Sequence, residues 1–369
     1  MLLLVLREIF PFLAALYLLD GLAWVGALNL LFVHRVWGWS AVEGKGVRLA
    51  GILPFDLSFP VAGPVALPLA DGLYLPDPAV RGADVYDPER WTRLPYEEVA
   101  VQGAEVEEGV LKLGPHRVRF PSRAHAEGFA ELLAELRPLS PEERERRLER
   151  HRARSFHLDS AQARLDTFRE ETQLLRVLGW GLFVMGLLLL PAVLYLHPTP
   201  ERILGPLAAG IAFLYIAALG AAAHAGSRLR GEKVLRRSAS ILPLVLSPVS
   251  SIRAMPAVGR DLLEGFDPLA VAALLLRRES LLARARGELH GASFAASRGE
   301  EGWRRHWAGR RRSVLALLDR FEIGEAEALA PPARRDASAR SWCPACGIES
   351  REEGGTCADC SLPLAAFET

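Results

Sequence analysis

The residues of this chain that could do chemistry are gathered near its C-terminal end. All four cysteines of the 369-residue sequence form two pairs, Cys343-Pro-Ala-Cys346 and Cys357-Ala-Asp-Cys360, with ten residues between the pairs. Two such pairs can place four thiolates tetrahedrally around one Zn²⁺. The segment is too short for a hydrophobic core of its own, so we expect the metal to supply most of its folding energy. Four protein ligands leave no open coordination position, which indicates a structural ion rather than a catalytic one.

Two other interpretations of the cysteines stay open, because iron in a rubredoxin-like site uses the same four thiolates and a redox-active dithiol needs only one pair. The stretch 342–364, with Gly347 directly after the first pair, resembles the small zinc ribbons that begin or end many bacterial regulatory and membrane proteins. Ser361 stands where such ribbons usually carry a glycine, so the second turn is expected to differ in shape. The resemblance implies a fold for this segment and no activity.

No catalytic motif accompanies the cysteines. Gly44-Lys45 lacks the upstream glycine and the following Ser or Thr of a Walker A loop, and Gly291-Ala-Ser293-Phe-Ala295 lacks the final glycine of a nucleophile elbow. The chain contains no His-Glu-x-x-His sequence. We therefore expect no enzymatic activity.

Three apolar segments indicate an integral membrane protein. Residues 177–196 and 203–223 contain no charged side chain, and a short turn with two prolines joins them. Each is about the 20 residues needed to cross a ~30 Å hydrocarbon core. Residues 9–33 are apolar apart from Asp20 and Asn29. We predict transmembrane helices over all three segments. A signal sequence is the alternative for the first, although its apolar run is long and no cleavage site stands out.

The positions of Lys and Arg predict how these helices are oriented. Arginines and a lysine crowd the exit of the third segment and the approach to the second, whereas the turn between them has only Arg202. Because cytoplasmic loops carry the excess of Lys and Arg, the predicted location is a bacterial inner membrane, multi-pass, with the soluble domains cytoplasmic and the N-terminus outside. A cytoplasmic location keeps thiols reduced, which favours metal over disulfides at the cysteines.

The region between the first two apolar segments, residues 41–137, predicts a cytoplasmic β-rich domain. Short alternating runs are separated by Gly and Pro, and an amphipathic helix follows with Phe129, Leu132, Leu133 and Leu136 on one face. This element order resembles the small pleckstrin-homology-like (PH-like) barrels of bacterial membrane proteins, which implies a binding module beside the membrane. Basic residues could contact lipid phosphates or form a solvated face: Lys112, Arg117, Arg119 and Arg123. The expected strands are 47–53, 65–69, 72–75, 97–102, 105–113 and 117–120.

The remaining soluble parts are predicted to be helical. Ser140-Pro-Glu-Glu143 has the spacing of a capping box and opens a charged connector helix over 141–173. Its interleaved glutamates cancel the field that phosphate binding needs, so nucleic acid is an unlikely partner. A cytoplasmic helical region covers 238–322, where Trp303 and Trp307 suit either a membrane surface or packing onto the domain. Residues 324–341 read as a linker that tethers the ribbon loosely.

The predicted fold class is thus a membrane α+β protein with a C-terminal zinc ribbon. The chain has 44 Lys and Arg residues together and 44 Asp and Glu residues together. The net charge is therefore too small to attract a charged partner over long range. The first functional hypothesis is a membrane-anchored interaction or scaffold protein, in which the β module and the ribbon bind another protein at the bilayer. The second is a subunit of a small oligomeric transporter or channel that uses Asp20 and the small residues of 203–223. We favour the first, because three spans with one intramembrane charge are few for transport.

Overall fold

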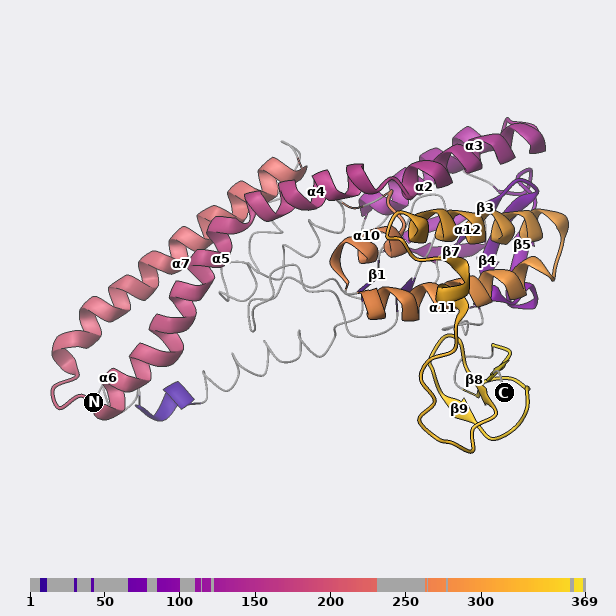
Figure 1. The fold of residues 1–369 in the computed structure, drawn as a ribbon. Helices are drawn as coiled ribbons and strands as arrows, with labels where there is room; N and C mark the ends of the chain where they lie inside the picture. The colour runs from indigo at the N-terminus through magenta and orange to yellow at the C-terminus, as the bar shows by residue number, and fades with distance from the viewer. Residues whose placement is uncertain are drawn as a thin grey trace. The chain divides into compact units, whose positions relative to one another are not determined.

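The computed structural model divides into two compact units, and each is described by itself. Unit 1 comprises Met1–Leu30, Gly44–Pro60 and Ala163–Leu263, and unit 2 comprises Leu31–Glu43, Val61–Gln162 and Glu264–Thr369. Figure 1 shows the elements of both. The structure describes residues 7–11, 30–31, 41–42, 66–77, 85–99, 110–113, 115–120, 123–230, 263, 265–276, 278–358 and 362–367.

Unit 1 is built around a helical hairpin. Its first arm is continuous from α5 (Gln173–Phe183) through the π-helical turn η3 (Val184–Leu189) to α6 (Leu190–Leu196), and α7 (Glu201–Arg230) returns beside it (Figure 1). Pro191 is the second residue after the π turn. Proline lacks an N–H and its ring clashes with the carbonyl four residues earlier, so a widened turn ahead of it relieves the clash. The segments predicted at 177–196 and 203–223 lie inside these helices.

Apolar side chains cover the outside of this hairpin. Within the described segments, one helix, Glu201–Leu229, is long and apolar enough to cross a membrane, and only 11% of its most apolar stretch is buried. The first arm contains a shorter apolar helix, Val184–Leu196. Large hydrophobic side chains are exposed on both arms. They are Leu174, Val177, Val184, Leu188, Leu189, Tyr195, Leu196, Phe213 and Ile216.

The first predicted span, 9–33, is described only at its ends. Residues 7–11 are helical, and Arg7 Nε donates a 2.7 Å hydrogen bond to the carbonyl of Leu194. The Tyr195 hydroxyl donates to the carbonyl of Arg7 at 2.9 Å, so the start of the chain contacts the end of the first arm. Leu30–Leu31 form strand β1, paired with β2 (Ala41–Val42), where the sequence predicted the end of a helix. Asp20 lies outside the described residues.

Unit 2 contains two small antiparallel sheets. The first has the order β3 (Leu67–Leu69), β4 (Gly72–Pro76), β5 (Trp91–Leu94), with the short 3₁₀ turn η2 (Pro88–Arg90) leading into β5. The second is the hairpin β6 (Val110–Leu113) and β7 (His116–Arg119), in which Leu111 pairs with Val118. Helix α2 (Arg123–Leu136) follows.

The predicted strands were confirmed in part. Strands β3, β4, β6 and β7 fall within or overlap the predicted runs, and Val118 and Phe120 are both buried. The predicted face of α2 is also correct, because Phe129, Leu132, Leu133 and Leu136 are all buried. The strand expected at 97–102 is wrong at its start, where Glu98 N donates to Pro95 O in a turn. Strand β5 was missed, and the strand expected at 47–53 lies outside the described residues.

The connector predicted over 141–173 consists of two helices, α3 (Pro141–Ser155) and α4 (Leu158–Glu171). Its capping box is confirmed: Ser140 Oγ accepts from Glu143 N, and Glu143 Oε2 accepts from Ser140 N. Although α3 is dense in charge, Arg144 and Arg152 are buried. Arg144 donates to the carbonyls of Leu136, Ala70 and Arg137, which replaces the water that its guanidinium loses.

The rest of unit 2 is helical, and its tryptophans face inward. Trp303 and Trp307 are 0% and 1% exposed and pack against Tyr74, Tyr86 and Trp91. Of the two interpretations left open by the sequence, packing onto the domain is therefore correct. The helices are α10 (Pro268–Leu275), α11 (Arg278–Ala296), α12 (Glu301–Asp319) and the short α13 (Glu325–Leu329), and residues 238–262 lie outside the described part of the chain.

Candidate metal centre

The C-terminal segment folds as two cysteine-bearing turns attached to one small sheet. Strands β8 (Ser341–Trp342), β9 (Glu349–Ser350) and β10 (Ala365–Ala366) form an antiparallel sheet in the order β10-β8-β9. The first turn connects β8 to β9. The second lies between Thr356 and Pro363, which form an isolated bridge.

The two turns are closed by equivalent backbone hydrogen bonds. Cys343 N donates to Ile348 O at 2.8 Å, and Cys357 N donates to Leu362 O at 2.8 Å, five positions apart in both cases. Gly347 follows the first pair with φ +73°, a conformation that glycine adopts without steric cost. Cys360 has the same place in the second pair as Cys346 in the first, and it lies outside the described residues.

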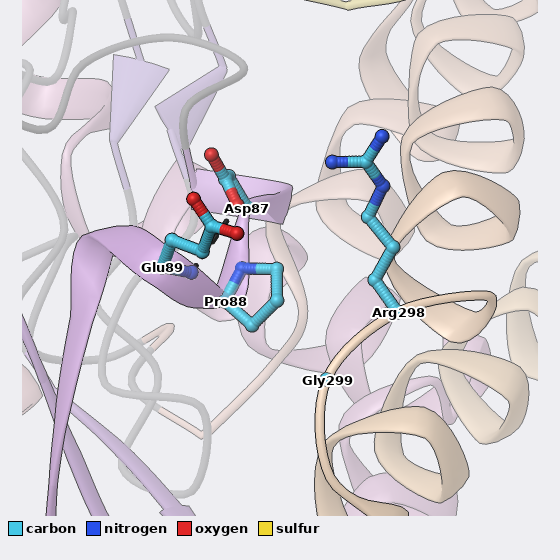
Figure 2. A pocket seen from close by; sticks show the side chains of 5 residues that line it. All are labelled: Asp87, Pro88, Glu89, Arg298 and Gly299. Atoms are coloured by element: carbon cyan, nitrogen blue, oxygen red, sulfur yellow. Dashed lines mark hydrogen bonds between the residues drawn. The ribbon is translucent and has the colours of Figure 1, made fainter.

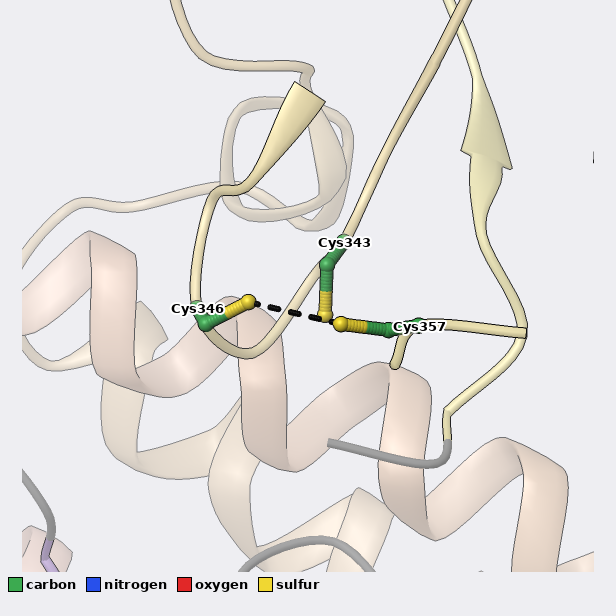
Figure 3. Close-up of side chains that lie close together, drawn as sticks. All are labelled: Cys343, Cys346 and Cys357. Atoms are coloured by element: carbon green, nitrogen blue, oxygen red, sulfur yellow. Dashed lines mark hydrogen bonds between the residues drawn. The ribbon is translucent and has the colours of Figure 1, made fainter. Parts of the chain in front are cut away.

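The three described cysteine side chains converge on one point (Figure 3). The sulfur atoms of Cys343, Cys346 and Cys357 all lie within 4.8 Å of one another, and those of Cys346 and Cys357 are 3.6 Å apart. Four sulfurs at Zn–S distances of about 2.3 Å in a tetrahedron are separated by about 3.8 Å, so the observed spacing fits a thiolate metal site. It is far longer than the ~2.05 Å of a disulfide.

The environment of Cys343 favours the protonated thiol over a free thiolate. Burial raises the pKa of the Cys343 thiol to about 12, while backbone hydrogen bonds from Cys346 and Ala345 act in the opposite direction by stabilising the thiolate. A bound divalent metal deprotonates a coordinating thiol outright. A metal bound here would therefore displace the proton that Cys343 otherwise keeps.

The stretch before the first cysteine is joined to the ribbon. The carboxylate of Glu349 accepts hydrogen bonds from the backbone N–H groups of Arg335 and Asp336, each at 2.7 Å. Arg340 N donates to Ser350 O, and Phe367 N donates to Arg340 O. Residues 324–341, expected as a loose linker, thus contain α13 at one end and are hydrogen-bonded to the ribbon at the other.

The ribbon also contacts α11. Gly287 lies so close to the first cysteine turn that a Cβ there would be 3.2 Å from Ala345 Cα. The Trp342 ring meets the His290 ring edge-on at 5.8 Å, and the Arg286 guanidinium lies 5.4 Å from the Trp342 ring centroid. Sequence reasoning missed this contact, although a glycine in the middle of a helix was a usable indication of close packing.

Unit 2 also has a concave surface away from the cysteines. A depression of about 480 Å³ is lined by Asp87, Pro88, Glu89, Arg298 and Gly299 (Figure 2). Asp87 Oδ1 accepts from Glu89 N at 3.2 Å and so caps η2, and the Arg298 guanidinium lies 4.2 Å from the Phe294 ring centroid. Two of its three charged side chains, Asp87 and Arg298, thus take part in local structure.

No protein-family model, curated protein or solved structure matches the chain. The assignment of a metal site therefore rests on the geometry of the cysteines themselves.

Proposed function

We propose that this protein is a membrane-anchored interaction protein whose soluble unit carries a structural zinc ribbon. The observation that carries the proposal is the convergence of Cys343, Cys346 and Cys357, with all sulfur atoms within 4.8 Å, on two turns that share one backbone pattern. Cys360 would complete the set of four. Such a site has no open position for substrate or water, so it suits a folding and binding role.

Zinc is the proposed metal, with iron as the alternative. Both ions accept four thiolates in a tetrahedron, so sulfur spacing alone does not separate them. Zinc has no redox chemistry, which suits a protein in which neither the sequence nor the described residues provide a catalytic group. Iron in this site would give a coloured protein, which provides a simple distinction.

The exposed apolar surface of α5–α7 supports membrane anchoring. Phe213 and Ile216 are 70% and 68% exposed on α7, and Val177 is 62% exposed on α5. A lipid bilayer would remove these apolar side chains from water, which is favourable. The bonds between Arg7 and the Leu194–Tyr195 end of the hairpin fit an arrangement in which the N-terminus and the hairpin tip lie on the outer side of a bacterial inner membrane. The arginine distribution favours soluble domains in the cytoplasm.

Unit 2 is the proposed binding part. Its two small sheets and α2 retain the strand-then-helix order that resembles a PH-like module, and the ribbon adds a second recognition surface. The partner is a protein at the membrane. Nucleic acid is disfavoured because the arginines of α3 alternate with glutamates, as in the sequence Glu142 to Arg154.

Crosslinking affinity purification from native membranes tests this proposal. Wild type is compared with a C343S/C346S double variant and with E353Q, which changes an exposed carboxylate of the ribbon. We expect one zinc per chain and a co-purifying protein in wild type and E353Q, and loss of both in the double variant, which should still insert into the membrane. An identical set of crosslinked proteins in all three would contradict the interaction role.

A further inference from the structure

The ribbon is seated on α11 through the loop that lies between two metal ligands. The atoms that meet Gly287 are Ala345 Cα at 3.2 Å and Pro344 O at 3.5 Å, measured from the position of a Cβ at Gly287. Pro344 and Ala345 are the two residues between Cys343 and Cys346. A metal bound by those cysteines would fix the loop that makes the contact, so metal binding and docking share one structural element.

The second cysteine turn contributes a buried side chain to the core of unit 2. Leu362, whose carbonyl closes that turn, is 1% exposed and belongs to the main hydrophobic cluster together with Ala292 and Ala295 of α11. Trp342, directly before the first ligand, is 2% exposed and is covered by Arg286 and His290 on one side and Phe367 on another. Trp342 therefore lies against α11, and Leu362 lies in the main hydrophobic cluster of unit 2.

The contact also contains polar atoms that it does not satisfy. Trp342 Nε1, His290 Nε2 and Arg286 Nε are buried and have no hydrogen-bond partner among the described residues. Burial also lowers the pKa of His290, with the Arg286 cation acting in the same direction. Each unsatisfied group opposes docking, because it loses water without replacement. An interface of this kind is less stable than a permanent core and is suited to opening.

We propose that the ribbon is a metal-dependent cap on α11: with zinc bound it docks on the Arg286-Gly287-His290 face, and on metal loss it releases and uncovers that face and Trp342. The inference rests on the proposed zinc site and adds a regulatory role to it. Without the metal the segment lacks the energy to hold two turns in register, so the shape that fits Gly287 is lost.

Hydroxyl-radical footprinting of the full-length protein in detergent tests the proposal, with oxidation of Trp342 followed by mass spectrometry and zinc measured on the same samples. The test variant is G287L, which places a side chain against Ala345 and improves the helix propensity of α11. The matched control is A283L, which adds the same side chain at an exposed position of the same helix.

We expect Trp342 to be protected in zinc-loaded wild type and A283L, and oxidised severalfold faster in G287L although that variant keeps its zinc. Chelation of zinc from wild type should raise Trp342 oxidation to a similar level, and added zinc should reverse it. Protection of Trp342 in G287L would overturn the docking, and protection after chelation would overturn its metal dependence. Loss of zinc from G287L would overturn the proposal that metal binding controls docking, because docking would then be needed to hold the metal. Absence of zinc from wild type would refute the zinc site itself, a result separate from these.

Discussion

The guanidinium of Arg310 and the carboxylate of Asp267 form a 2.5 Å ion pair in which the side chains are 3% and 0% exposed. Glu288 adds a second carboxylate at 2.9 Å from Arg310 Nε. Burial alone would lower the pKa of Arg310, but the two carboxylates outweigh it and raise that pKa above its ordinary value. The pair joins α12 to the start of α10, where Asp267 Oδ1 also accepts from Leu269 N.

Replacement of Asp267 by Asn should destabilise unit 2 strongly. Asn keeps an oxygen that can cap α10 but removes the charge, so Arg310 stays buried with one carboxylate instead of two. Breaking a buried pair costs about 3–5 kcal/mol of unfolding free energy. Denaturant unfolding followed by tryptophan fluorescence measures the change. The control is D159N, which removes the exposed 3.4 Å pair with Arg320 and should cost less than about 1 kcal/mol. Equal losses in the two variants would contradict the role given to burial.

His306 should make stability fall in mildly acidic solution. Burial, with the cations of Arg152 and Arg310, holds the pKa of His306 well below its ordinary 6.5. In the unfolded chain the ring takes up a proton below about pH 6.5, while in the folded protein it does not. Its contribution to stability is therefore complete above about pH 6.5 and is lost as the pH falls toward the folded-state pKa, by about 1.4 kcal/mol per pH unit.

The variant H306Q isolates this effect, because any loss of zinc at low pH affects it and wild type alike. The decrease in unfolding free energy between pH 7 and pH 5 should be smaller in H306Q by roughly 1–2 kcal/mol. If H306Q and wild type lose stability in parallel, His306 is protonated in the folded protein.

Features set by local sequence were predictable in this chain. The capping box at Ser140 and the apolar face of α2 depend on residues within one or two helical turns, and the cysteine spacing fixed which side chains could meet. Strand β5 was missed because Trp91–Leu94 is short and follows the turn residues Asp87-Pro88, which favoured a loop. The ends of local patterns were also unreliable, as at Leu30–Leu31.

Tertiary burial of charge was not predictable from the sequence. Arg144, Arg152 and Arg310 lie in stretches dense in charge, where exposure is the ordinary expectation. Their burial depends on carbonyls and carboxylates from other elements, such as Ala70 O for Arg144 and Asp267 for Arg310. The contact between the ribbon and Gly287 was unpredictable for the same reason, since it joins segments that are far apart along the chain.

Cys360 should prove to be the fourth ligand. It follows Cys357 at the spacing that separates Cys346 from Cys343, in a turn closed by the same hydrogen bond. The variant C360S should lose zinc at a chelator concentration at which wild type keeps it. The neighbouring variant S361A should keep its zinc as wild type does. Zinc retention by C360S equal to wild type would show that three cysteines and another group form the site. Metal content by mass spectrometry after dialysis against the chelator gives the answer.

The packing of the α5–α7 hairpin should depend on Gly181. A Cβ at this position of α5 would lie 3.1 Å from Leu214 Cδ1 of α7, whereas one at Gly220 of α7 would meet nothing within 4 Å. G181L therefore forces the two arms apart, and overpacking of this kind costs about 1–3 kcal/mol. The melting temperature in detergent should fall by roughly 2–10 °C. G220L adds the same side chain at an exposed position and should melt with wild type. A G181L protein as stable as G220L would mean that α5 and α7 do not pack through this glycine.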